Sequence, residues 1–77
     1  MARRWIIRSD KDLGRTIAGL RDLRGMTQSD LSAATGIDRS YLARIEAGHA
    51  TRMVDRLIQM LRALGAELTV QEHPGEY

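Results

Sequence analysis

The spacing of apolar residues changes along this chain, and each change marks a different predicted element. Residues 4–8 form a short stretch of aromatic and β-branched residues, which is typical of a strand. Apolar residues then recur at positions i, i+4 and i+7 from Leu13 onwards, and this period predicts an amphipathic helix over residues 10–24. Near the end of the chain, residues 66–71 alternate between apolar and polar, which predicts a half-buried strand.

Capping residues and glycines divide the middle of the chain into short helices. Ser9 and Thr27 are each followed three residues later by an aspartate, which is a signature of a helix start. The predicted N-caps are Ser9, Thr27, Asp38 and Thr51, and the glycines that end the helices are Gly25, Gly36, Gly48 and Gly65. The second and third helices are very short, and their spacing about the turn at Gly36 predicts a helix-turn-helix over residues 27–48.

The predicted helices carry apolar faces that indicate a shared core. The inward positions of the second and third helices are Leu31, Ala34, Leu42 and Ile45. The fourth helix has a continuous apolar stripe made of Met53, Leu57, Met60, Leu61 and Leu64. We therefore expect a four-helix, all-α core with short flanking strands.

The two predicted strands need a neighbour, because a lone strand of five or six residues is not stable by itself. They can pair within the chain or across a dimer. We favour a sheet that includes a second subunit, since the strands would otherwise expose an apolar patch on a very small domain. The residues assigned to this dimer interface are Trp5, Ile7, Leu68 and Val70. Frayed termini are the alternative.

Length and composition restrict the class of protein. A chain of 77 residues has room for a single domain, spanning residues 1–77, and it buries a modest fraction of its surface. The absence of cysteine excludes a disulfide framework and a thiolate metal site. No apolar run is long enough for a membrane span. The N-terminal apolar stretch is also too short, and too closely followed by charged residues, to be a signal peptide. We expect a cytoplasmic protein that does not interact with membranes.

Charge is distributed unevenly along the chain. Residues 39–62 contain five arginines against two acids, whereas residues 63–77 contain three glutamates and no lysine or arginine. Eleven of the twelve basic residues are arginine, the side chain best suited to bidentate pairing with phosphate or guanine. A codon bias towards arginine is the alternative explanation.

Three segments together resemble the Cro and phage-repressor type of helix-turn-helix, often called the XRE family. They are Met26–Ser32, Gly36–Ile37 and Tyr41–Gly48, and the resemblance extends over residues 13–65. It implies a four- to five-helix, repressor-like DNA-binding domain. In that family a glutamine at the position of Gln28 packs over the DNA backbone and the start of the recognition helix.

The first residues of the third helix are polar-tipped, as in a helix that reads base edges with its N-terminal end. Arg39 can form a bidentate pair with guanine, and Ser40 can bond to a base or a phosphate. Arg44, one turn further, can reach the next bases or a phosphate. Tyr41 is a fourth base-reading candidate, with a contact to the backbone or to the neighbouring subunit as the alternative.

Contacts to the DNA backbone are expected at the start of the second helix and in the loop before the fourth. The candidates are Thr27, Gln28, Ser29, His49, Thr51 and Arg52. Free amides at both helix starts suit phosphate oxygens. A solvated loop is the alternative for the second group.

Arg21 and Glu46 match a structural pair of the family. There, an arginine seven residues before the glutamine position pairs with a glutamate of the recognition helix and locks the first helix to it. The resemblance thus implies a structural ion pair between Arg21 and Glu46.

The flanking strands resemble those of HipB-like antitoxins, which are dimeric repressors that also hold a HipA-type serine/threonine kinase toxin. This resemblance implies a homodimer on an inverted-repeat operator in double-stranded DNA, nucleoid-associated when bound, with a kinase-like toxin as a possible partner. A stand-alone regulator of the same family, and a protein-interaction module that does not bind DNA, are the alternatives.

Catalytic chemistry is not indicated. No nucleophile lies beside a paired base, and His49 and His73 lack metal-ligand spacing. We therefore expect no catalytic residues, no metal and no cofactor.

Overall fold

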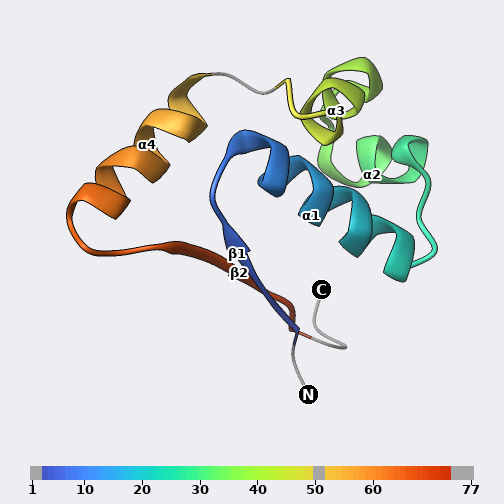
Figure 1. The fold of residues 1–77 in the computed structure, drawn as a ribbon. Helices are drawn as coiled ribbons and strands as arrows, with labels where there is room; N and C mark the ends of the chain where they lie inside the picture. Colours follow the sequence, from blue (N-terminus) through green and yellow to red (C-terminus); the bar gives the residue numbers. More distant parts are fainter. Residues whose placement is uncertain (1–2, 50–51, 74–77) are drawn as a thin grey trace.

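The computed structural model describes residues 3–49 and 52–73. Its elements follow in the order β1 (Arg4–Ile7), α1 (Asp10–Leu23), α2 (Gln28–Thr35), α3 (Arg39–Glu46), α4 (Arg52–Ala63) and β2 (Leu68–Gln71). The helices α1, α2 and α3 form one cluster, α4 lies apart from that cluster, and the two strands run beneath both (Figure 1). This arrangement confirms the predicted all-α fold with short terminal strands. None of the described helices is long and apolar enough to cross a membrane.

The strands β1 and β2 pair with each other, antiparallel, within the single chain. Trp5 lies opposite Val70 and Ile7 lies opposite Leu68, so alternation places these four side chains on one face of the sheet. Ile7 is only 2% exposed, because β1 packs against α1, and the other three are half-buried. Ile7 therefore belongs to the core of its own chain and not to the surface to which we assigned it. A contact of the other three with a second copy remains a prediction.

The predicted helix starts are confirmed by their capping hydrogen bonds. Ser9 Oγ accepts from the backbone N–H of Asp12 at 3.1 Å. At α2, Thr27 Oγ1 accepts from Asp30 N at 3.0 Å while the Asp30 carboxylate accepts from Thr27 N at 2.8 Å, which completes a capping box. The bond that the Asp30 carboxylate accepts from the backbone of Thr27 lowers the pKa of Asp30. Thr51, the predicted cap of α4, lies outside the described residues.

The core depends on a close approach between α1 and the end of α3. A Cβ on Gly14 would lie 2.2 Å from the carbonyl oxygen of Ile45, so only glycine allows the two backbones to come this near. Leu42 of α3 is 4% exposed beside this contact between helices. Ala34, predicted to face inward, is instead exposed, because it lines an open groove of about 540 Å³ between α1, α2 and the end of β2.

Helix α4 carries two adjacent rows of apolar side chains and buries only one of them. The inner row is Val54, Ile58 and Leu61, and the outer row is Met53, Leu57, Met60 and Leu64. Ile58 is 2% exposed, whereas the residues of the outer row are 49% to 81% exposed. The predicted apolar stripe thus exists, but four of its five residues lie on the surface, since the core of one chain is wide enough to cover only one row.

Candidate nucleic-acid interface

The turn between α2 and α3 is held by two hydroxyl side chains of α2. Gly36 adopts a φ of +75°, a left-handed conformation that glycine reaches without strain. Ser32 Oγ donates to the carbonyl oxygen of Ile37 at 2.6 Å, and Ile37 N donates to Thr35 Oγ1 at 3.2 Å. Ser32 and Thr35 were not among the predicted site residues, although hydroxyls just ahead of a turn glycine are a recognisable signal. These bonds fix the turn residue Ile37, two residues before α3, to the end of α2.

The start of α3 is capped by Asp38, as predicted. Its carboxylate accepts from Ser40 N at 3.1 Å and also from the hydroxyl of Ser40. The bond from the Ser40 side chain lowers the pKa of Asp38, so this carboxyl stays ionised. Because a hydroxyl has a single proton to donate, Ser40 can offer a ligand only an acceptor oxygen.

The outward side of α3 lies opposite the one residue of this helix that is fully buried, Leu42. With 3.6 residues per turn, the side opposite Leu42 carries Ser40 and Arg44, which lie one turn apart. Arg39 and Tyr41 flank this pair, and all four residues are exposed. Ser40, Tyr41 and Arg44 thus point away from the core, while Arg39 is exposed at the N-terminal end of α3, and we call these four exposed side chains the reading face.

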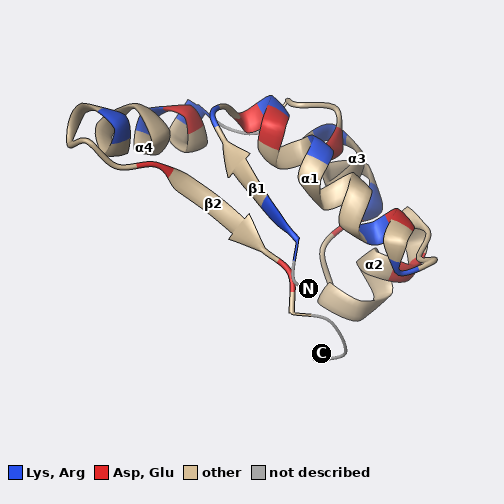
Figure 2. Ribbon diagram, turned by 60° about the horizontal axis from the view of Figure 1, so that its bottom comes forward, with Lys and Arg blue, Asp and Glu red and all other residues tan. Residues whose placement is uncertain are grey.

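The reading face is electrostatically suited to an anionic ligand. Within residues 3–49 and 52–73, neither Arg39 nor Arg44 forms an ion pair. Arginines also lie along α4, and acidic residues lie at both ends of β2 (Figure 2).

Arg21 of α1 and Glu46 of α3 form a bidentate ion pair that joins the two helices. Arg21 Nε donates to Glu46 Oε2 at 2.8 Å, and Nη2 donates to Oε1 at 2.9 Å. The two side chains are only 14% and 7% exposed. The pair lowers the pKa of Glu46 and raises that of Arg21, since each charge is stabilised by the other. Nη1 of Arg21 also donates to the carbonyl oxygen of Met26 at 2.8 Å, which ties in the loop before α2.

Gln28 extends this pair into α2. Its Nε2 donates to Glu46 Oε1 at 3.0 Å, so the side chain of Gln28 lies against the end of α3. The three residues Arg21, Gln28 and Glu46, which we call the locking cluster, connect α1, α2 and α3 through charged hydrogen bonds. The orientation of the reading face therefore depends on a buried polar network.

The other predicted backbone-contact residues lie at the start of α2, after α3 and at the start of α4. Ser29 is exposed in the first turn of α2, and Thr27 is exposed but uses its hydroxyl oxygen as the cap. His49 is exposed just after α3, and Arg52 is exposed at the first position of α4. Thr51 falls outside the described residues.

Two positions that orient the site were not predicted. Gly14 permits the approach of α1 to α3, and the signal for it is a glycine inside a helical pattern. Asp55 of α4 accepts from Asp10 N at 2.8 Å and so links the starts of α4 and α1. No local pattern distinguishes Asp55 from a solvated carboxylate.

Comparison with known proteins adds independent evidence. Residues 17–71 match the helix-turn-helix family HTH_3. Two similar proteins of Sinorhizobium fredii (strain NBRC 101917 / NGR234) are named uncharacterized HTH-type transcriptional regulators, y4mF and y4dJ. The first is 28% identical over 76 residues, covering 99% of this chain and 96% of the relative. The second is 34% identical over 55 residues, covering 71% of each. No solved structure matches this chain.

The matched range contains the whole of α2, the turn and α3, together with Arg21 of the locking cluster. The chain therefore belongs to the helix-turn-helix family.

Proposed function

We propose that this chain is a transcription regulator that places α3 in the major groove of an operator, as one half of a homodimer on an inverted repeat. The observation that carries the proposal is the reading face, four exposed polar-tipped side chains on a helix whose end is locked to α1. The names of both relatives, HTH-type transcriptional regulators, support the same class. The dimer represses transcription by occupying a promoter.

Each residue of the reading face has a distinct chemical role. Arg39, at the first position of α3, presents the fork of donors that pairs with O6 and N7 of guanine. The hydroxyl of Ser40 donates to Asp38, and its oxygen accepts from the amino group of adenine or cytosine. Arg44 reaches the next base or a phosphate, and Tyr41 contacts a base at the edge of the reading face.

Phosphates are held by the residues around that face. Gln28 gives one amide N–H to Glu46, and its second N–H is directed to a phosphate. Arg52 supplies a full positive charge at the start of α4, and Ser29 and His49 complete the set on either side. These contacts fix the register of the protein on the duplex but carry no sequence information.

Salt dependence tests whether the chain binds DNA at all. Binding of a fluorescent random-sequence duplex is measured by anisotropy as the salt concentration rises. We expect the logarithm of the affinity to fall steeply and linearly with the logarithm of the salt concentration, because phosphate contacts release counterions. The duplexes that bind most tightly are then selected from a random pool, and we expect them to contain an inverted repeat. An absence of binding even at low salt contradicts the proposal and favours a protein-interaction module.

We further propose that the regulator is the antitoxin of a toxin–antitoxin pair and also holds a HipA-type kinase toxin. The observation that favours this role over a stand-alone regulator is the paired strands β1 and β2 at the two ends of the helical core, a feature of HipB-like antitoxins. An adjacent reading frame that encodes a kinase-like protein, and its co-purification with this chain, support the role. A neighbouring gene product that does not bind this chain contradicts it.

A further inference from the structure

The outer row of α4 has no partner within the described part of its own chain, and we propose that a second copy of the same chain covers it. In this arrangement the α4 helices of two chains pack against each other along Met53, Leu57, Met60 and Leu64. The contact is isologous, since the same row is buried on both chains.

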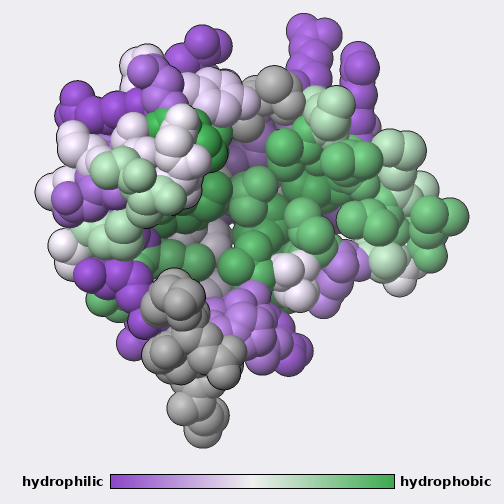
Figure 3. Space-filling view, turned by 180° about the vertical axis from the view of Figure 1, so that it is seen from behind, coloured by the Kyte–Doolittle hydropathy of each residue, from purple (hydrophilic) through white to green (hydrophobic). Residues whose placement is uncertain are grey.

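The shape and chemistry of the outer row suit a helix–helix contact. Its members follow at i, i+4, i+7 and i+11, so they form one straight seam along α4. No charged side chain lies in the seam, so a partner does not have to desolvate a charge. Figure 3 shows hydrophobic side chains gathered over the side of the molecule on which α4 lies. Monomeric soluble proteins rarely leave apolar patches of more than a few hundred Å² exposed.

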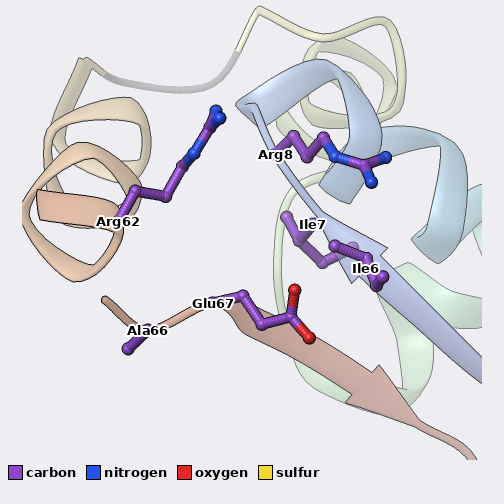
Figure 4. A pocket seen from close by; sticks show the side chains of 6 residues that line it. All are labelled: Ile6, Ile7, Arg8, Arg62, Ala66 and Glu67. Carbon is purple, nitrogen blue, oxygen red and sulfur yellow. The ribbon is translucent and has the colours of Figure 1, made fainter. Parts of the chain in front are cut away.

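The opposite side of α4 has a different character. Where α4 approaches β1, a hollow of about 200 Å³ is lined by Arg8, Arg62 and Glu67 together with three apolar residues (Figure 4). Burying these three charges against an apolar partner would be costly. The face of the sheet that carries Trp5, Ile7, Leu68 and Val70 offers little area to a partner, because Ile7 is already buried within its own chain. Of these three surfaces, which are the outer row, the charged hollow and the face of the sheet, the outer row is therefore the best suited to contact a second copy.

The position of α3 supports the same choice, and this step rests on the proposed function. Recognition helices that read two half-sites lie about 34–36 Å apart, so each lies about 17–18 Å from the two-fold axis. The longest dimension of the chain is 36 Å, and α3 and α4 lie towards opposite sides of the molecule (Figure 1). An axis beside α4 thus carries the two α3 helices outwards, away from each other, as reading two half-sites requires.

Two matched pairs of variants test the interface in the absence of DNA, so that the result does not depend on the proposed function. The chain has no cysteine, and each introduced thiol is therefore unique. Leu57→Cys places a thiol in the middle of the seam, and Gln59→Cys places one on the polar side of α4. Under mild oxidation with diamide, we expect Leu57→Cys to form a disulfide-linked dimer at least about tenfold faster than Gln59→Cys, since a disulfide needs Cα atoms within about 7 Å.

The second pair measures association by sedimentation equilibrium. Leu57→Glu places two like charges in the seam and is expected to raise the dissociation constant of the dimer by about 100-fold or more, whereas Gln59→Glu leaves it unchanged. Mixing Leu57→Glu with Leu57→Lys restores a dimer, because the charges are then opposite. Circular dichroism shows whether each variant keeps its helices. If Leu57→Glu loses them, the comparison of cross-linking rates between Leu57→Cys and Gln59→Cys decides whether the interface exists.

Three outcomes overturn the proposal. They are a wild-type chain that stays monomeric at high concentration, a Leu57→Glu chain that dimerises like the wild type, and a Gln59→Cys chain that cross-links as fast as Leu57→Cys. A dimer that passes these tests but binds no duplex supports the interface and contradicts only the proposed function.

Discussion

Removing the carboxylate of Glu46 tests the locking cluster most severely. In the Glu46→Ala variant, Arg21 loses both bonds of a bidentate pair whose side chains are 14% and 7% exposed, and Gln28 loses its acceptor. Breaking one side of a buried pair costs about 3–5 kcal/mol, because the remaining charge is left without compensation. A domain of this length has a total stability of roughly 4–12 kcal/mol. In a domain of 60–100 residues each kcal/mol lowers the melting temperature by about 4–8 °C, so we expect a fall of at least about 12 °C.

The matched control is Asp22→Ala. Asp22 also pairs with Arg21, at 3.2 Å, but its side chain is 74% exposed, so solvent already screens the interaction. We expect its melting temperature to stay within about 5 °C of the wild type. Thermal unfolding followed by circular dichroism gives both values. The reasoning is refuted if Glu46→Ala has the same melting temperature as the wild type, or if Asp22→Ala lowers the melting temperature as much as Glu46→Ala does.

Three further predictions concern stability. Hydrogen bonds lower the pKa values of Asp30, Asp38 and Glu46 below their ordinary values of 3.8, 3.8 and 4.5. The stability that these three ionised carboxylates contribute is therefore complete above about pH 5 and is lost as the pH falls through their lowered pKa values in the folded state. A melting temperature that does not change between about pH 5 and pH 3 contradicts this. Gly14→Ala forces a Cβ to 2.2 Å from a backbone oxygen and is expected to cost about 1–3 kcal/mol in urea unfolding. Gly19→Ala, with nothing within 4 Å, should instead stabilise α1 by about 0.5–1 kcal/mol, and equal effects at the two glycines would show that packing is not the cause. Asp38→Ala removes the cap of α3 and should lower the melting temperature by about 5 °C; no change would mean that the cap is dispensable.

The parts of the fold that depend on local chemistry could be predicted from the sequence. The capping box of Thr27 and Asp30, and the glycine that ends each helix, act over one turn of backbone, so their residue types are visible in the chain. The alternation that predicted β2 is equally local, because it reflects which side of a strand faces the core.

The remaining features depend on contacts between distant segments. The apolar residues of α4 form two adjacent rows, and no spacing rule states which row the chain itself covers. Gly14 is visible as a glycine in a helix, but only the packed structure shows the carbonyl that it meets. In each case a tertiary neighbour decides what a correctly identified residue does.

The central claim is that α3 reads the DNA sequence while the residues around it hold the backbone. The most direct test compares Arg39→Ala with Arg52→Ala on a selected operator and on operators altered at single base pairs. We predict that Arg39→Ala loses discrimination at one base pair, by about 1–3 kcal/mol, and leaves the other positions unchanged. Arg52→Ala should weaken binding to all sequences alike and reduce the slope of the salt dependence by about one. Equal losses on every sequence for Arg39→Ala would contradict the claim, because Arg39 would then contact a phosphate and not a base.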